Sequence, residues 1–322
     1  MNNTYYIIGI DGGGTNTKVC LFNNKGQTIL EISGKGTNLF IYKKLAIDRL
    51  IDLLNNISNV SKIPLDEVSA FGFGLAGVSD ENQRESLLKE LDRIGISSNS
   101  IILSDSEIAF HLLCPIGTGL LLCIGTGIVC LGRSSEGETY KVAGKGHDAD
   151  IGSGYWIGKQ AIDRVILNLG LISADKDINE IYTLLMNSYN LDNIDNLYKV
   201  FENSDSIAKI ASITENIIEL AENGNDIALS IIQEATRNVG EYIMSVLEKL
   251  NYNNKDLIFA GHGSVLKNIY FRKLLNQALE FDIKNIHWVL SDISPAFSAG
   301  IIAGASKNIN VSIEKIVKNM KN

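Results

Sequence analysis

An acidic, glycine-dense turn lies near the start of the sequence, between two apolar runs of strand character. It reads Asp11-Gly12-Gly13-Gly14-Thr15-Asn16-Thr17-Lys18, so that two threonine hydroxyls stand beside the glycines. Glycines let a ligand approach the backbone closely, and successive N–H groups of a turn form a concavity that binds anions. Asp11 cannot hold a phosphate itself, but it suits a divalent cation that bridges to one. The pattern predicts a nucleotide-phosphate loop, because an ordinary hairpin needs a turn of only two residues.

A shorter version of the same unit recurs in the middle of the chain. The apolar strand Leu120–Ile124 leads into Gly125-Thr126-Gly127, and a second strand, Ile128–Leu131, follows. Repetition of a supersecondary unit is a strong architectural signal. Two glycine/threonine hairpins that face each other across a cleft could bind a polyphosphate from both sides.

Apolar patterns predict that strands and helices alternate around the first hairpin. Three strands are expected first, then helix, strand, helix, strand and helix, with Val68–Leu75 and Ile101–Leu103 as the later strands. Asp105 comes almost directly after the second of these. Because ligands collect at the carboxyl ends of strands in open α/β sheets, we expect polar groups such as Asp105 at that edge.

The second half of the chain is predicted to be mostly helical from 153 to 250, with long apolar stripes that face a core. A strand, Leu257–Ala260, then precedes the turn Gly261-His262-Gly263-Ser264 and a further helix. A last strand, Ile286–Leu290, is followed by a closing helix that begins at Ser294-Pro295, a good cap and first-turn pair.

The bulk composition fits two globular domains. The chain has 322 residues, of which 45% are hydrophobic and 20% charged. Its net charge is −8, and Lys and Arg form no block longer than a pair, so nucleic acid is not an expected partner. An anionic ligand must then be bound locally, by backbone N–H groups and a metal ion. The sequence shows neither the pattern of a signal peptide nor an apolar run of ~20 residues. It therefore predicts a cytoplasmic protein that does not span a membrane.

The cysteines show no spacing typical of a metal site. Cys20, Cys114, Cys123 and Cys130 lack a Cys-x-x-Cys pair, and three of them fall in apolar, strand-like runs. We expect buried free thiols.

Taken in order along the chain, these motifs resemble the sugar kinase, actin and heat-shock-chaperone ATPase superfamily. More narrowly they resemble the N-acetylglucosamine kinases and their glucosamine- and muramic-acid-kinase relatives, over nearly the whole chain. The motifs that carry the resemblance are Asp11–Lys18, Gly36-Thr37-Asn38, Ser104-Asp105, Gly125-Thr126-Gly127 and Gly152–Gly158.

The resemblance implies an α/β fold of two ribonuclease H-like, or actin-like ATPase, domains. Each would have a mixed β-sheet flanked by helices, the second duplicating the first, with an interdomain cleft. The domains are expected at 1–115 and 116–310, with the final helix at 311–322 packed on the first.

The resemblance also implies that ATP and Mg²⁺ are the cofactors. Asp11 would orient the hydrated Mg²⁺. The expected nucleotide-binding residues are Gly13, Gly14, Thr15, Asn16, Thr17 and Lys18 in the first hairpin, Gly125, Thr126 and Gly127 in the second, and Gly224, Gly261, Gly263 and Ser264 near the adenosine. A helix C-cap would account for Gly224 equally well.

Asp105 is the expected general base. A sugar hydroxyl that attacks a γ-phosphate must lose its proton and be aligned, and a carboxylate at a strand end can do both. The alternative is that Asp105 caps a helix that starts at Ser106.

The expected sugar-binding residues lie in several loops: Asn38, Gly77, Asp105, Gly144, Lys145, Gly146 and Asp150. Two positions depart from the N-acetylglucosamine kinases, which typically have Trp where Lys145 stands and Glu where Ile151 stands. Lys145 could meet an anionic substituent such as the lactyl carboxylate of muramic acid, or be a solvated surface lysine.

The resemblance therefore predicts an ATP-dependent amino-sugar kinase. N-acetylglucosamine, phosphorylated at its 6-hydroxyl, is the leading substrate, and N-acetylmuramic acid and glucosamine are further ones. A homodimer active in cell-wall recycling is implied. The alternatives are an ATPase activator of a 2-hydroxyacyl-CoA dehydratase, which needs exposed cysteines for an iron–sulfur cluster, and a non-catalytic sugar sensor.

Overall fold

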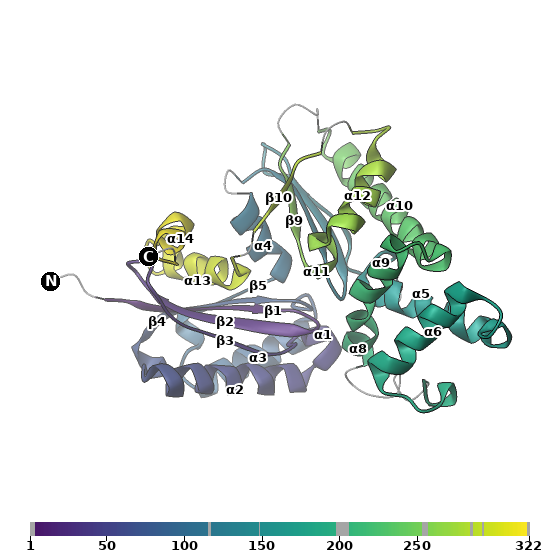
Figure 1. The fold of residues 1–322 in the computed structure, drawn as a ribbon. Helices are drawn as coiled ribbons and strands as arrows, with labels where there is room; N and C mark the ends of the chain where they lie inside the picture. The colour runs from purple at the N-terminus through teal and green to yellow at the C-terminus, as the bar shows by residue number, and fades with distance from the viewer. Residues whose placement is uncertain are drawn as a thin grey trace. The chain divides into compact units, whose positions relative to one another are not determined.

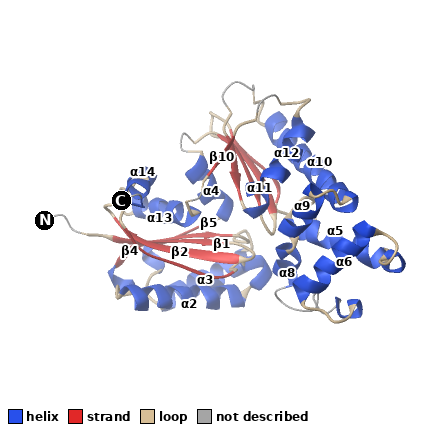
Figure 2. Cartoon of the chain, viewed as in Figure 1, coloured by secondary structure: helices blue, strands red, loops and turns tan. Residues whose placement is uncertain are grey.

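The computed structural model describes residues 4–114, 117–147, 149–197, 206–252, 257–283, 286–291 and 293–320. Its contacts group into two units, Met1–Leu112 with Ser291–Asn322, and Leu113–Leu290. Each unit contains a five-stranded mixed sheet with helices beside it (Figures 1 and 2). The expected domain boundary between 115 and 116 lies outside the described residues.

The sheet of the first unit has the strand order β3-β2-β1-β4-β5. Strands β1 to β3 form an antiparallel meander, and β4 and β5 extend it in parallel from β1. Their bounds are β1 (Tyr6–Gly12), β2 (Asn16–Asn23), β3 (Thr28–Lys35), β4 (Val68–Leu75) and β5 (Ser100–Leu103). The predicted strand Val68–Leu75 is confirmed at both ends. Its run of buried residues is typical of a strand covered on both faces.

Helices cover both faces of this sheet. Apolar residues of α2 and α3 pack with Ile8, Ile10 and Phe71 on one face, while α13 and α14 pack with Ile7 and Phe22 on the other. Figure 1 shows α2 and α3 on the side of the sheet opposite to α13. The bounds are α1 (Leu39–Tyr42), α2 (Lys44–Ser61), α3 (Glu81–Arg93), α4 (Asp105–Leu113), α13 (Pro295–Ser306) and α14 (Ile313–Met320).

Helix α13 lies against the first sheet at van der Waals distance. A Cβ atom added to Gly9 would stand 1.8 Å from the Ala296 carbonyl oxygen, and one added to Gly72 would stand 1.9 Å from that of Ala299. Only glycine permits this approach of helix backbone to sheet backbone. The sequence expectation ended the second domain at 310, whereas the contacts group 291–322 with the first unit.

The second unit repeats the topology of the first. Its strand order is β10-β9-β6-β7-β8, with an antiparallel β6-β7-β8 meander and β9 and β10 added in parallel to β6. The bounds are β6 (Gly119–Ile124), β7 (Ile128–Arg133), β8 (Thr139–Ala143), β9 (Phe259–His262) and β10 (Trp288–Leu290). The predicted repetition of the opening hairpin is thus confirmed.

One strand of this unit differs from its prediction. The sequence pattern ended it at Ala260 and began a turn at Gly261, but β9 continues through His262. Gly261 and His262 pair with Leu122 and Cys123 of β6. The prediction was wrong because glycine and histidine read as turn residues locally, whereas the parallel ladder with β6 extends the strand.

The remaining elements of the second unit are helices that share one core with its β-sheet. The buried face of α10 includes Ile231, Ala235, Val239, Ile243 and Val246, which confirms the predicted stripe. The bounds are α5 (Gly154–Leu167), α6 (Lys176–Tyr189), α8 (Ser206–Ser212), α9 (Thr214–Glu222), α10 (Asp226–Lys249), α11 (Ser264–Lys267) and α12 (Ile269–Leu279).

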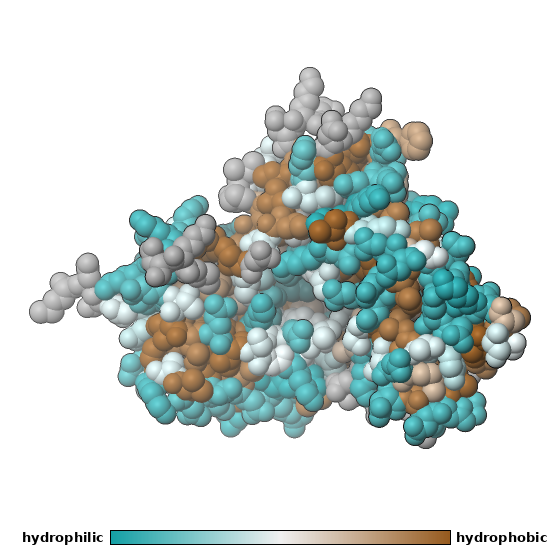
Figure 3. Space-filling model, viewed as in Figure 1, coloured by the Kyte–Doolittle hydropathy of each residue, from teal (hydrophilic) through white to brown (hydrophobic). Residues whose placement is uncertain are grey.

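Large apolar side chains are exposed at several places along the described part of the chain. Figure 3 shows hydrophilic residues over much of the visible face, with hydrophobic areas between them. Leu167, Ile269 and Phe281 are the most exposed large apolar side chains, and they come from different segments of the second unit. Within the described residues, every helix is too short or too polar to span a bilayer.

Candidate active site

The first glycine hairpin joins β1 to β2. The ladder between these strands ends with Asp11 opposite Lys18 and Gly12 opposite Thr17. The N–H of Gly13 donates to the Asn16 carbonyl at 3.0 Å, which closes the loop. Gly13 and Gly14 are half-buried, whereas Thr15, Asn16 and Lys18 are exposed. Of the six residues predicted to bind the nucleotide here, three are thus exposed and two are half-buried.

Thr17 differs from its neighbours in the hairpin because its hydroxyl points into the protein. It is fully buried, and its Oγ1 donates to the Lys35 carbonyl at 2.9 Å and lies 2.9 Å from Oγ1 of Thr37. This hydroxyl therefore ties β2 to the segment around Thr37. We assign Thr17 a structural role in place of the expected contact with the nucleotide.

Asp11 and Asp105 interact electrostatically at the carboxyl ends of β1 and β5. Burial, together with the charge of Asp105, raises the pKa of Asp11 to about 7, and the charge of Lys18 acts in the opposite direction. Two carboxylates near each other resist ionising together unless a cation lies with them. Mg²⁺ is commonly held by one or two carboxylates together with phosphate oxygens and water. The Asp11 carboxylate, together with phosphate oxygens and water, fits that ion, and the described residues hold no cluster of three or more His, Cys, Asp or Glu that would suit another metal.

Asp105 is the first residue of α4, and other residues cap this helix. The Ser104 hydroxyl accepts from the N–H of Glu107 at 3.2 Å, and the Glu107 carboxylate accepts from the N–H of Ser104 at 2.8 Å. This reciprocal pair is a capping box. The Asp105 carboxylate accepts from the neighbouring N–H of Ser106 at 2.8 Å, which is not a capping contact. The alternative that Asp105 is the cap is therefore wrong, and the Ser-x-x-Glu spacing was the signal that the sequence reasoning missed.

The structure brings two of the predicted sugar residues together beside the first hairpin. Asn38 caps α1, and its Oδ1 accepts from the N–H groups of Phe40 and Ile41 at 3.0 and 3.1 Å. Gly77 has φ +77, and a Cβ there would lie 2.5 Å from that same oxygen. The N–H of Ala76 donates to the Gly12 carbonyl at 2.8 Å. Because its oxygen serves the cap, the Asn38 side chain offers a ligand the N–H donors of its amide.

The second hairpin has a three-residue loop against the start of α5. The N–H of Gly125 donates to the Gly127 carbonyl at 2.9 Å. The carbonyls of Gly125 and Thr126 accept from the N–H groups of Gly154 and Tyr155 at 2.8 and 3.0 Å. A Cβ added to Gly125 or Gly127 would meet nothing within 4 Å. Neither glycine is needed for packing, which is consistent with a ligand that approaches this loop closely.

The loop that follows β8 is organised around Asp150. Its two carboxylate oxygens accept from the N–H groups of Lys145 and Gly146 at 3.0 and 3.2 Å. Burial raises the pKa of Asp150, while hydrogen bonds from the backbone of Lys145, Gly146 and Gly144 lower it. Gly144 and Gly146 have φ +72 and +116, which other residues rarely adopt. The side chain of Asp150 thus shapes the loop, and Lys145 is exposed on it.

The residues predicted near the adenosine have different environments. Gly261 is buried in β9, where a Cβ would lie 2.5 Å from Leu290, so packing accounts for this glycine. Gly263 has φ +96, and a Cβ there would lie 2.2 Å from the Ile124 carbonyl oxygen. That approach sets Gly263 and the exposed Ser264 next to the second hairpin.

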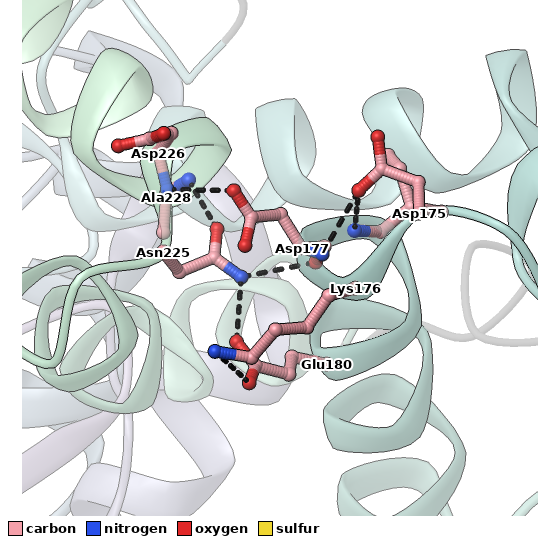
Figure 4. Close-up of polar contacts among 8 residues, drawn as sticks. Asp175, Lys176, Asp177, Glu180, Asn225, Asp226 and Ala228 are labelled. Atoms are coloured by element: carbon pink, nitrogen blue, oxygen red, sulfur yellow. Dashed lines mark hydrogen bonds and ion pairs between the residues drawn. The ribbon is translucent and has the colours of Figure 1, made fainter.

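Gly224 lies in the turn between α9 and α10, with φ +92 and open space around it. The turn is held by Asn225, whose amide donates to the Asp177 carbonyl and the Glu180 carboxylate, both at 3.0 Å. The Asn225 oxygen accepts from the N–H of Ala228 at 2.8 Å, and Figure 4 shows these contacts between the starts of α6 and α10. The positive φ after a helix end is sufficient to explain Gly224.

Comparisons with known proteins agree with this arrangement. The chain matches the BadF/BadG/BcrA/BcrD ATPase family over residues 8–320. A match of this extent decides the family. The chain belongs to the BadF/BadG/BcrA/BcrD ATPase family.

Individual relatives of this ATPase-family chain are sugar kinases by name. It is 29% identical over 309 residues to the N-acetylmuramic acid/N-acetylglucosamine kinase of Clostridium acetobutylicum, covering 92% of this chain and 98% of that one. A protein from Chromobacterium violaceum, provisionally named N-acetylglucosamine kinase, has a similar structure, with a TM-score of 0.73, 18% identity, and coverage of 93% and 99%. A glucokinase of the ROK family from Streptomyces griseus, solved with glucose and AMPPNP, has a TM-score of 0.56, 15% identity, and coverage of 94% and 98%.

These findings confirm the predicted fold and the resemblance to amino-sugar kinases. Two mixed five-stranded sheets flanked by helices match the actin-like fold of the sugar kinases. The prediction of an ATP-dependent enzyme of the sugar-kinase type is also confirmed, because the family is one of ATPases and the relatives are named kinases.

Three of the four cysteines of this ATPase-family chain lie in the protein interior. Cys20, Cys114 and Cys130 are buried, and Cys123 is partly exposed. Burial raises the pKa of the Cys114 thiol to about 12, and it also raises the pKa values of Cys20 and Cys130. Because the thiolate is the form that binds iron or another metal, these thiols do not favour the activator alternative.

Proposed function

We propose that this chain transfers the γ-phosphoryl group of ATP to a hydroxyl of an amino sugar. N-acetylglucosamine, phosphorylated on its 6-hydroxyl, is the leading substrate, and N-acetylmuramic acid is the second. Support comes from the ATPase family, and from a relative whose name includes both sugars. The resemblance to amino-sugar kinases also supports a cytoplasmic homodimer that acts in amino-sugar and cell-wall recycling metabolism.

The observation that carries the proposal is the position of Asp105 beside Asp11. Asp105 is the first residue of α4, shortly after β5 ends, and Ser104 and Glu107 form the cap of this helix. In the proposed reaction Asp105 accepts the proton of the sugar hydroxyl and aligns its oxygen for attack on the γ-phosphorus. The Asp105 carboxyl keeps this proton until it passes to solvent as the products leave.

Asp11 would hold Mg²⁺ through its hydration shell. When bound, this ion neutralises charge on the β- and γ-phosphates and on Asp11 itself. The exposed parts of the two glycine hairpins donate N–H groups to the phosphate oxygens. Their glycines at 13, 125 and 127 leave room for that close approach.

The identity of the sugar is tested by ADP release across a panel. Purified protein is given Mg-ATP with N-acetylglucosamine, N-acetylmuramic acid, glucosamine or glucose, and ADP is followed by a coupled assay. We expect release that depends on the N-acetylated sugars. If no sugar on the panel stimulates ADP release above the rate with ATP alone, the proposed function is wrong.

Lys145 is expected to favour a sugar that carries a carboxylate. Lys145→Met should raise the KM for N-acetylmuramic acid about fivefold, since an exposed ion pair contributes up to ~1 kcal/mol, and leave that for N-acetylglucosamine unchanged. Lys249→Met, at an exposed lysine near the end of α10, is the matched control. Equal effects of Lys145→Met on both sugars would contradict this role.

Asn38 is expected to donate to the sugar through its amide N–H groups. Asn38→Asp keeps the oxygen that caps α1 and places a negative charge at the helix start, so Tm should not fall. It removes the amide donors, so the KM for the sugar should rise about tenfold. Asn268→Asp, which changes the same kind of cap on α12, should leave the kinetics intact. An unchanged KM in Asn38→Asp would show that this amide does not contact the sugar.

A further inference from the structure

Two successive carbonyls of the first hairpin accept hydrogen bonds from residues outside the hairpin. The Gly13 carbonyl accepts from the N–H of Thr37 at 3.0 Å, and the Gly14 carbonyl accepts from the phenol of Tyr42 at 2.8 Å. Both donors come from one short segment, the residues that lead into and form α1. The segment therefore fixes the orientation of two neighbouring peptide groups in the loop.

Fixing a carbonyl also fixes the N–H group of the same peptide. A trans peptide is planar, so its C=O and N–H point in opposite directions. The N–H that shares a peptide with the Gly13 carbonyl belongs to Gly14, and the N–H that shares one with the Gly14 carbonyl belongs to Thr15. Both N–H groups are thus directed away from the segment that holds the carbonyls. Successive N–H groups directed together make an anion-binding concavity.

In the second hairpin, too, two successive carbonyls accept hydrogen bonds from outside the hairpin, but the donors differ. The carbonyls of Gly125 and Thr126 accept from the N–H groups of Gly154 and Tyr155. The N–H groups of Thr126 and Gly127 are consequently directed away from α5. In the second unit both donors are backbone groups, whereas in the first unit one donor is a side chain. Because the Tyr42 donor is a side-chain hydroxyl, a substitution can remove this hydrogen bond without changing the backbone.

Tyr42 is itself held in place by Arg49. The Arg49 guanidinium lies 4.4 Å from the centroid of the Tyr42 ring, a cation–π contact, and its Nη1 donates to the Gly36 carbonyl at 2.6 Å. Gly36 in turn approaches the loop so closely that a Cβ there would lie 2.3 Å from the Gly14 carbonyl oxygen. The ring of Tyr42 is buried, with 7% of its surface exposed. The phenol is thus fixed at the Gly14 carbonyl.

We propose that Tyr42 is a positioning residue for nucleotide binding. Its phenol orients the Gly14–Thr15 peptide so that the Thr15 N–H donates to a phosphate of ATP, and Arg49 holds the phenol in place. This inference rests on the proposed function, because it assigns a group that prepares the phosphate loop. Without the hydroxyl, the peptide between Gly14 and Thr15 can rotate, since glycine permits many backbone conformations.

The test is a comparison of nucleotides with and without phosphates. Tyr42→Phe keeps the ring, its packing and its contact with Arg49 and removes only the hydroxyl. Binding of ATP and of adenosine is measured in the absence of sugar by calorimetry or competition. We expect the Kd for ATP to rise about fivefold and the Kd for adenosine to stay the same. In turnover, the KM for ATP should rise and the KM for the sugar should not change.

Tyr189→Phe is the matched control, because the Tyr189 phenol also donates to a backbone carbonyl, that of Lys209 at 3.3 Å, in the other unit. It should leave both nucleotide affinities unchanged. Arg49→Met should weaken ATP binding about twofold to threefold by loosening the Tyr42 ring. Tm is recorded for every variant.

The outcomes separate this inference from the proposed function. If wild-type protein binds ATP and Tyr42→Phe binds it equally well, the role of Tyr42 is wrong and the kinase proposal stands. If Tyr42→Phe weakens ATP and adenosine by the same factor, with a lower Tm, the residue is structural and the inference is overturned. If the wild-type protein binds no ATP, the proposed function fails and the inference fails with it.

Discussion

Replacing Asp105 with Asn should lower kcat about 10³-fold while the protein continues to bind ATP. The loss is that of a general base, a group that contributes ~10²- to 10⁴-fold in other enzymes. Asn has the shape of Asp and keeps an oxygen that can accept from the N–H of Ser106, so the first turn of α4 is preserved. The measurement is sugar-dependent ADP release together with the Kd for ATP.

The neighbouring carboxylate provides the control for this variant. Glu107→Gln alters the side chain that accepts from Ser104 in the capping box, yet it leaves Asp105 in place. It should reduce Tm slightly and leave kcat within about twofold. Near-normal turnover in Asp105→Asn, or an equal loss in Glu107→Gln, would remove Asp105 from the role of base.

Replacing Asp11 with Asn should make the metal-free protein more stable and the enzyme less active. Burial, together with the charge of Asp105, raises the pKa of Asp11 from 3.8 to about 7. The folded state therefore holds the proton more tightly than the unfolded state does. The contribution of this group to stability is fully present below pH 4 and is lost as the pH rises to about 7.

Asn does not ionise, so its contribution to folding stability does not change as the pH rises. We expect Asp11→Asn to raise the free energy of unfolding at pH 8 by on the order of 2–4 kcal/mol, since each tenfold change in proton affinity corresponds to about 1.4 kcal/mol. At pH 5 the gain should be smaller by about 2 kcal/mol. Urea unfolding of the protein with EDTA measures both.

Activity should change in the opposite direction. Without a carboxylate to hold the hydrated ion, Asp11→Asn should need far more Mg²⁺ for half-maximal turnover, and kcat should fall at least tenfold. Asp66→Asn, at an exposed carboxyl of the same unit, should alter neither stability nor magnesium dependence. A stability gain that does not depend on pH, or an unchanged magnesium requirement, would contradict this account of Asp11.

The secondary structure around the site was largely predictable because its signals are local. The strand Val68–Leu75 is a continuous apolar run, and the stripe on α10 repeats with the helical period. The hairpin at Asp11–Lys18 combines both features with its glycines, and its repetition at 120–131 established the duplicated fold. These patterns depend on residues within a few positions of one another.

The roles of single side chains within the site were less predictable. Thr17 and Thr15 look alike in the sequence, but only the tertiary contact with Thr37 shows that the Thr17 hydroxyl is buried. The sequence predicts a sugar contact for Asp150, and only the folded loop shows that both of its carboxylate oxygens also accept from backbone N–H groups. In each case the deciding partner is set by the path of the chain, and residue type alone cannot specify it.

The sequence by itself determined the family, the two glycine hairpins, the alternation of strands and helices, and the acidic residues at the strand ends. It did so because local periodicity and glycine content follow directly from backbone sterics and from burial. The tertiary structure alone decided that α13 packs on the first sheet through Gly9 and Gly72. It also decided that Tyr42 reaches Gly14, 28 positions away. Contacts of this kind depend on how distant segments meet in the folded chain, and no local pattern in the sequence records them.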